Sequence, residues 1–93
     1  MDISPVNLEN EFNKKSEEVK LIKKKPTDSE LLNLYQYYKQ ATIGDCNIKE
    51  PSYFNPKERA KYFAWKKLKG TSKEDSINSY ISLVNGIIKK YSS

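Results

Sequence analysis

The stretch Tyr35-Gln-Tyr-Tyr-Lys-Gln-Ala-Thr-Ile-Gly44 has the pattern of the last turns of a helix that ends at a glycine. Tyr35 and Lys39 are four residues apart and Tyr38 directly precedes Lys39, so all three project from nearly the same helical face. Two aromatic rings beside an ammonium group can stack on a planar ring and hold a phosphate at the same time. Packing of both tyrosines in a core is the alternative interpretation.

The composition around this stretch is that of one well-solvated domain. The chain has 93 residues, of which 37% are hydrophobic and 31% charged. A chain of this size buries only about 60–65% of its unfolded surface, which favours a surface groove over a deep internal site. No apolar run approaches the roughly 20 residues of a membrane span, and no basic start followed by an apolar segment indicates a signal peptide. We therefore expect a cytoplasmic protein.

Cysteine and histidine usage excludes several kinds of chemistry. Cys46 is the only cysteine and the chain has no histidine, so an internal disulfide, Cys/His zinc sites, Ser-His-Asp triads and Cys-His dyads are all excluded. Glutamates such as Glu17 and Glu18 lie on an amphipathic pattern and are interpreted as solvated. We expect no catalytic residue, no metal and no cofactor.

The formal net charge of +5 favours an anionic partner: nucleic acid, a membrane surface or a phosphorylated small molecule.

Sparse glycines and prolines divide the chain into four stretches with helical periodicity, and no stretch alternates as a strand does, so an all-α fold is predicted. The first helix is expected from Ser4 or Asn7 to Lys24, with Ser4 as N-cap of a helix whose first residue is Pro5. Its apolar stripe comprises Leu8, Phe12, Val19 and Ile22. The lysines at 23–25 are interpreted as favourable charge at the helix C-terminus, with a ligand role as the alternative.

The second helix is predicted to open with a capping box at Thr27-Asp-Ser-Glu30 and to end at Gly44. Asp45 to Pro56 then has no clear period and contains two prolines. It is either a functional loop or a crossover that lets the next helix reach a non-adjacent position.

The third helix, predicted over 56–69, is short and very basic. Lys61 borders its apolar side, where it can lean over a groove. A second capping box, Thr71-Ser-Lys-Glu74, is predicted to open the last helix. That helix has the strongest apolar stripe of the chain and should dominate the core: Ile77, Tyr80, Ile81, Val84, Ile87, Ile88 and Tyr91. Tyr80 has a polar tip that can reach the edge of a ligand site, although packing alone also explains it.

Three classes of function fit these features. A carrier for an anionic amphipathic molecule needs ammonium groups and aromatic faces, which Tyr35, Tyr38, Lys39 and Lys61 supply. A nucleic-acid-binding module is the alternative that the basic third helix supports, although no helix-turn-helix, zinc or basic-zipper pattern appears. An enzyme is the least supported, because no base or nucleophile can be named.

Three segments together resemble the acyl-CoA-binding protein family. They are Pro26-Thr-x-x-x-Leu31-Leu-x-Leu-Tyr35-x-x-Tyr38-Lys39-Gln40-Ala41-Thr42-Ile-Gly44-Asp45, Lys61-x-x-Ala64-Trp65-x-x-Leu68-Lys69-Gly70-Thr71-Ser72-Lys73-Glu74-Asp75, and Tyr80-Ile81-x-x-Val84. The resemblance runs from about Phe12 to Tyr91. It implies a four-helix bundle with a long crossover between its second and third helices, and intracellular binding and transport of long-chain acyl-CoA without catalysis.

The resemblance also implies roles for individual residues. Tyr35, Lys39 and Lys61 match positions that serve the 3′-phosphate of the nucleotide. Tyr38 and Tyr80 match positions flanking adenosine and pantetheine, and Lys20 matches a lysine on the same face. The acyl chain is expected in a groove between the first two helices, for which the candidates are Ser16, Leu31 and Leu32.

The domain is expected to span residues 1–93, with residues 1–10 as a short N-terminal extension. We expect a monomer that binds acyl-CoA and no nucleic acid, has no stable membrane insertion, and makes at most transient contact with membranes or acyl-CoA-using enzymes.

Ser29 and Gln36 depart from the family pattern and are expected to face solvent. Tyr62 stands where tryptophan is common, and the loop at 53–56 is atypical.

Overall fold

The structure is a computed structural model of the whole chain and describes the backbone of residues 5–91 and the side chains of residues 7–91. Four α-helices follow one another: α1 (Pro5–Glu18), α2 (Asp28–Thr42), α3 (Pro56–Lys66) and α4 (Lys73–Tyr91), with a short 3₁₀ helix η1 (Val19–Leu21) continuing α1. No strand occurs within residues 5–91. The all-α, four-helix prediction is confirmed. Pro5 begins α1 as predicted, whereas the proposed cap Ser4 lies outside the described residues.

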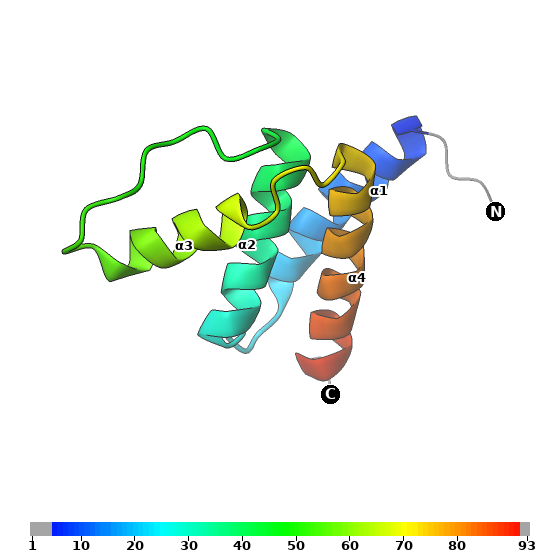
Figure 1. Ribbon diagram of the computed structural model, residues 1–93. Coiled ribbons are helices and arrows are strands. Elements are labelled where there is room, and N and C mark those ends of the chain that lie inside the picture. The colour runs from blue at the N-terminus through cyan, green and yellow to red at the C-terminus, as the bar shows by residue number, and fades with distance from the viewer. Residues whose placement is uncertain (1–4, 92–93) are drawn as a thin grey trace.

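Helix α4 packs against both α1 and α2, and α3 packs against α2 alone among the helices (Figure 1). Helices α1 and α4 run in the same direction, as shown by the ion pair between Glu9 near the start of α1 and Lys73 at the start of α4. Helices α2 and α4 run in opposite directions, as shown by the hydrogen bond between Glu30 near the start of α2 and Tyr91 at the end of α4. The end of α3 also lies at the end of α2, since Trp65 bonds to Gly44, so the long connection from Thr42 to Pro56 runs back along α2 and is the predicted crossover.

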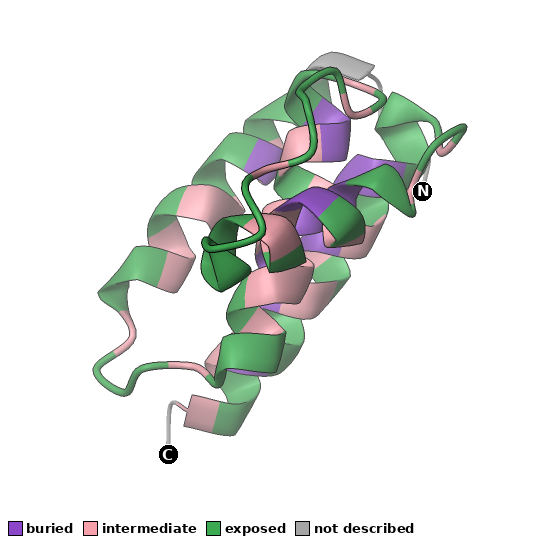
Figure 2. Ribbon diagram, turned by 60° about the vertical axis from the view of Figure 1, so that its left-hand side comes forward, coloured by how far each residue is buried: buried purple, intermediate pink, exposed green. Residues whose placement is uncertain are grey.

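The core lies where α1, α2 and α4 meet, and Figure 2 shows the buried segments on those facing surfaces while most of the crossover loop is exposed. Val84 is fully buried, and the predicted stripe of α4 supplies half of the cluster. The cluster comprises Leu8, Phe12, Leu34, Ala41, Ile77, Tyr80, Val84 and Ile87. Within the predicted N-terminal extension, residues 5–10 belong to α1 and Leu8 is part of this core.

The predicted ends of α2 are confirmed. The Thr27 hydroxyl accepts the N–H of Glu30 at 3.1 Å, and the Glu30 carboxylate accepts the N–H of Thr27 at 2.8 Å, which completes the capping box. At the other end Gly44 has φ of 100°, and its N–H donates to the carbonyl of Lys39 at 3.3 Å. A left-handed backbone is favourable for glycine because it has no Cβ.

Two helices end earlier than predicted. The first was expected to reach Lys24, but α1 ends at Glu18, η1 at Leu21, and Ile22 is extended with ψ of 142°. The β-branched Val19 and Ile22 lower the helix propensity there, so the lysines at 23–25 lie in the connection beyond the helix. The third was expected to reach Lys69, but α3 ends at Lys66 and tightens into i→i+3 turns.

Two local predictions were wrong. The N-cap of α4 is Ser72 and not Thr71, because the Ser72 hydroxyl accepts the N–H of Asp75 at 3.0 Å. Gln36, which was expected to face solvent, is only 5% exposed. It lies with Gln40 on one face of α2, and four-residue spacing carries both side chains inward when α4 packs there. Ser29 is exposed, as expected.

Candidate functional site

Two lysines from different helices converge on the ring of Tyr35. Lys39 lies four residues after Tyr35 on α2, and its Nζ is 5.8 Å from the ring centroid. Lys61 reaches the same ring from α3, with its Nζ 5.3 Å from the centroid. Lys61 also pairs with Glu58 at 3.6 Å, whereas Lys39 makes no ion pair within the described part of the chain. We call Tyr35, Lys39 and Lys61 the basic end of the site; its charge suits a phosphate.

Burial raises the pKa of the Tyr35 hydroxyl above its ordinary value, and the nearby Glu58 and Cys46 add to the shift. A tyrosine hydroxyl is protonated at neutral pH even at its ordinary pKa, and this upward shift acts in the same direction. A protonated phenol can donate a hydrogen bond to a phosphate oxygen, whereas a phenolate would repel it. The basic end thus combines a neutral donor with two ammonium groups.

Contacts at the end of α2 hold α3, and therefore Lys61, in position. Trp65 lies one turn after Lys61, is 1% exposed, and donates its indole N–H to the carbonyl of Gly44 at 2.8 Å. The Asp45 carboxylate accepts the N–H of Gly70 at 2.9 Å and the side-chain amide of Gln40 at 2.9 Å. These bonds, with the Gly70 contact first, hold the pKa of Asp45 below its ordinary value.

Gln40 ties this junction to the next segment as well. Its side-chain amide donates to the carbonyl of Thr71 at 3.0 Å, and the residue is 2% exposed. We call Gln40, Gly44, Asp45, Trp65 and Gly70 the α2–α3 junction. It fixes the C-terminal end of α3 to the end of α2, so the geometry of the basic end depends on it.

A cluster of three aromatic rings joins α1, α2 and α4. Phe12 from α1 stacks on Tyr38 from α2, with ring centroids 5.4 Å apart, and meets Tyr80 from α4 edge-on at 5.0 Å. Tyr38 is 41% exposed, so one side of its ring is open to a ligand. Burial, followed by the effects of Tyr38 and Glu17, raises the pKa of Tyr80 to about 12. The Tyr80 side chain is therefore uncharged, and it forms a buried part of the wall of the site.

A pocket of about 300 Å³ joins these two regions. It lies between α1, α2 and α4, and its lining residues are Ser16, Glu17, Val19, Lys20, Leu31, Leu34, Tyr35, Tyr38 and Tyr80. Because Tyr35 belongs both to this pocket and to the basic end, the surface passes without a break from two ammonium groups to aromatic rings and then to aliphatic side chains. Such a surface is complementary to an anionic head joined to an apolar tail.

The structure brings together most of the residues that the sequence singled out. Ser16, Lys20, Leu31, Tyr35, Tyr38 and Tyr80 line the pocket, and Lys39 and Lys61 adjoin it through Tyr35. Lys20 is largely exposed and pairs with Glu17 at 3.4 Å. Leu32 is not among the lining residues, because it follows Leu31 on α2 and projects about 100° further round the helix.

Sequence reasoning missed some of the pocket wall. Phe12 and Val19 were assigned only to the core stripe, and Leu34 only to the buried face of α2. Phe12 lies behind Tyr38, while Val19 and Leu34 line the pocket directly. Their i, i+3, i+4 spacing marks a buried stripe, but it does not say which edge of that stripe remains open after packing.

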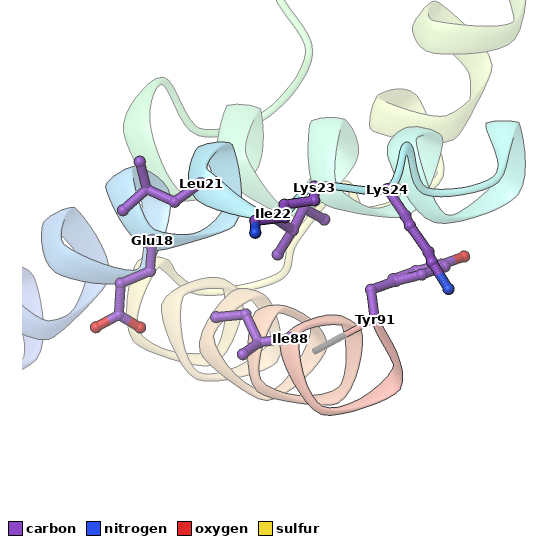
Figure 3. A pocket seen from close by; sticks show the side chains of 7 residues that line it. All are labelled: Glu18, Leu21, Ile22, Lys23, Lys24, Ile88 and Tyr91. Carbon is purple, nitrogen blue, oxygen red and sulfur yellow. The ribbon is translucent and has the colours of Figure 1, made fainter. Parts of the chain in front are cut away.

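A larger pocket, of about 510 Å³, lies between the end of α1 and the end of α4 (Figure 3). It is lined by Glu18, Leu21, Ile22, Lys23, Lys24, Ile88 and Tyr91. Figure 3 shows Ile22 projecting toward α4, on which Ile88 lies. The residues that converge on Tyr35 take no part in it. Two of the three lysines at 23–25 line it, so they are not solely a helix-terminus feature.

The described residues hold neither a metal-ligand cluster nor a membrane-spanning helix. No group of three or more His, Cys, Asp or Glu side chains within residues 5–91 is placed to hold a metal ion. Over the same residues, no helix combines the length and the apolar character needed to cross a bilayer.

Comparison with known proteins places this geometry in a family. Residues 9–84 match the family model described as acyl CoA binding protein. The chain is 49% identical over 82 residues to the acyl-CoA-binding protein of Saccharomyces cerevisiae, covering 88% of this chain and 94% of that protein. It is also 49% identical over 80 residues to the acyl-CoA-binding protein of Dictyostelium discoideum, covering 86% and 95%.

Solved structures agree. The crystal structure of Oryza sativa acyl-CoA-binding protein 2 superposes with a TM-score of 0.89 at 35% identity, covering 95% of this chain and 96% of that one. The crystal structure of the protein from Moniliophthora perniciosa gives a TM-score of 0.84 at 40% identity, covering 91% and 84%. With its fold, its family model and its relatives in agreement, this chain belongs to the acyl-CoA-binding protein family.

Proposed function

We propose that this protein binds long-chain fatty acyl-CoA thioesters in the surface pocket and acts as a carrier and pool former for them in lipid metabolism. The observation that carries the proposal is the convergence of Lys39 and Lys61 on Tyr35 at one end of an aromatic and aliphatic pocket. The family to which the chain belongs supports the same ligand. The protein acts without catalysis and without a cofactor, as a cytoplasmic monomer that exchanges its ligand by transient contact with membranes or acyl-CoA-using enzymes.

Each part of the ligand has a complementary surface. The 3′-phosphate accepts charge-assisted hydrogen bonds from Lys39 and Lys61 and a hydrogen bond from the Tyr35 hydroxyl. The adenine ring stacks on the open side of Tyr38, and the acyl chain covers the aliphatic wall near Leu31. Burial of the chain contributes roughly 0.8 kcal/mol per methylene. Head and tail therefore both contribute, and a ligand that lacks either part binds weakly.

Calorimetry with three ligands tests this mechanism. We expect tight one-to-one binding of palmitoyl-CoA, weak binding of CoA and almost none of palmitate. Palmitate lacks the phosphates that the basic end binds, so its affinity should be far lower than that of palmitoyl-CoA. CoA lacks the acyl chain that covers the pocket wall, so its affinity should also be lower. Equal affinity for palmitate and palmitoyl-CoA would contradict the role of the basic end.

Lysine variants test the residues themselves. Lys39→Ala and Lys61→Ala should each weaken palmitoyl-CoA binding by roughly 1.5–3 kcal/mol, because each removes a charge-assisted contact. Lys66→Ala is a matched control, since Lys66 is also on α3 but contacts the ring of Tyr62 instead. The alternative, a basic nucleic-acid-binding module, predicts affinity for duplex DNA with a steep salt dependence and no response to acyl-CoA.

A further inference from the structure

The crossover loop carries two aromatic side chains that the proposed ligand site does not use. Tyr53 is 82% exposed and Phe54 is 91% exposed, and their ring centroids lie 6.1 Å apart in an edge-on arrangement. Neither ring lines any of the pockets described above. Figure 1 shows this part of the loop, immediately before α3, at the margin of the molecule. We call Tyr53 and Phe54 the aromatic tip.

The aromatic tip belongs to a turn that the surrounding chain holds in place. The carbonyl of Ser52 accepts the N–H of Asn55 at 2.9 Å, and the Ser52 hydroxyl accepts the N–H of Phe54 at 3.2 Å. Arg59 on α3 donates to the carbonyl of Pro51 at 3.1 Å. Its guanidinium also lies 5.8 Å from the ring centroid of Tyr53. The two rings are therefore presented to solvent by a braced turn, at low conformational-entropy cost on binding.

Charge around the aromatic tip is positive once its ion pairs are counted. Arg59 pairs with Glu50 at 2.6 Å, and Lys61 pairs with Glu58 at 3.6 Å. Lys49 and Lys57 are exposed and make no ion pair within residues 5–91. The tip thus combines two exposed aromatic rings with two exposed lysines that no carboxylate within residues 5–91 neutralises.

We propose that the aromatic tip docks this protein onto bilayers that contain anionic phospholipid, with the rings entering the interfacial region and Lys49 and Lys57 facing the headgroups. Aromatic side chains are enriched at membrane–water interfaces, and lysines near an anionic leaflet are attracted to it. The benefit to a carrier rests on the proposed function: Lys61 follows Pro56 by five residues, or about 8 Å along α3, so docking brings the basic end close to membrane-dissolved acyl-CoA.

Flotation with vesicles of phosphatidylcholine containing about 30% phosphatidylserine, without acyl-CoA, tests the docking. We expect the wild-type protein to float with these vesicles and not with pure phosphatidylcholine. Tyr53→Ser/Phe54→Ser should lower the partition coefficient roughly tenfold or more, because both rings lose interfacial burial. Lys49→Gln and Lys57→Gln should each lower it roughly fivefold, and added salt should weaken the wild-type binding.

A reporter variant shows whether the tip itself enters the bilayer. Phe54→Trp should give a blue-shifted emission on addition of the anionic vesicles, while the emission of the buried Trp65 stays constant. Leu21→Ser is the matched control, because Leu21 is 79% exposed on η1, next to other lysines, and away from the crossover loop. Leu21→Ser should leave the vesicle binding unchanged.

Several results would overturn the proposal: no binding to anionic vesicles, equal binding by the tip variant, or an equal loss in Leu21→Ser. Self-association that disappears in the tip variant, without any vesicle binding, would assign the surface to a second copy of the chain instead. Calorimetry with palmitoyl-CoA separates this test from the ligand proposal. The tip variant should bind palmitoyl-CoA with wild-type affinity, because neither ring belongs to the pocket.

Discussion

The two ends of α2 are held in place in different ways. The start is fixed mainly by an exposed capping box, in which Thr27 and Glu30 bond to each other, and by the Tyr91 hydroxyl at 2.5 Å from Glu30. The end is fixed by buried groups from three segments, centred on Trp65 and Gln40. The first arrangement stabilises a helix. The second also determines where Lys61 lies relative to Tyr35, so stability and ligand binding should be separable by mutating the two ends.

The largest effect is expected from Trp65→Ala, which removes the centre of the α2–α3 junction. Loss of a fully buried tryptophan should lower the free energy of unfolding by about 3–5 kcal/mol and weaken palmitoyl-CoA binding, since Lys61 loses its support. Urea denaturation followed by circular dichroism measures the stability. Phe63→Ala is the control on the same helix, because Phe63 is 44% exposed. Similar losses in both variants would contradict a special role for the junction.

A smaller effect is expected at the two buried glutamines of α2. Gln40→Leu should lower the free energy of unfolding by about 1–3 kcal/mol, because the carbonyl of Thr71 loses its donor. Gln36→Leu should change it by less than about 0.5 kcal/mol or raise it, since the amide of Gln36 donates only locally, to the Asn33 side chain at 2.9 Å on the same helix. The Oε1 atoms of both glutamines are buried with no partner within the described residues, so the contrast rests on the donors alone. Only the first change should weaken palmitoyl-CoA binding. Equal behaviour would show that the junction does not depend on Gln40.

Two glycines give a matched pair of backbone substitutions. Gly44→Ala should lower the free energy of unfolding by about 1 kcal/mol, because φ of 100° is unfavourable for alanine although nothing lies within 4 Å of its Cβ. Gly86→Ala in α4 should raise it by up to about 1 kcal/mol, because that position is helical and its Cβ also meets nothing within 4 Å. Thermal melts of both variants test the opposite signs.

The smallest effect is expected at the start of α2, and it depends on pH. Hydrogen bonds, with Tyr91 first and the N–H of Thr27 next, lower the pKa of Glu30 from 4.5 to about 2. Because the folded state holds the carboxylate, this contribution is fully present above pH 4.5 and is lost as the pH falls toward 2. Tyr91→Phe should raise the pKa of Glu30 in a carboxyl NMR titration, without changing palmitoyl-CoA affinity at neutral pH. An unchanged pKa would contradict the bond.

Local spacing was enough to predict much of this molecule. The capping box at Thr27, the left-handed Gly44, the stripe of α4 and the shared face of Tyr35 and Lys39 all depend on contacts within one turn of helix, which sequence spacing reports directly. The same spacing was less accurate at helix ends, where Ile22 turns into extended backbone and Ser72 replaces Thr71 as cap, because neighbouring residues compete for those positions.

Only the tertiary structure decided the rest. The Trp65–Gly44 bond places Lys61 over Tyr35, the contact between α1 and α2 side chains puts Phe12 behind Tyr38, and the packing of α4 buries Gln36. The exposure of Tyr53 and Phe54 likewise depends on the path of the crossover loop and on Arg59. These contacts join residues far apart in the chain, and their formation depends on how whole helix faces fit together rather than on any spacing that one segment carries.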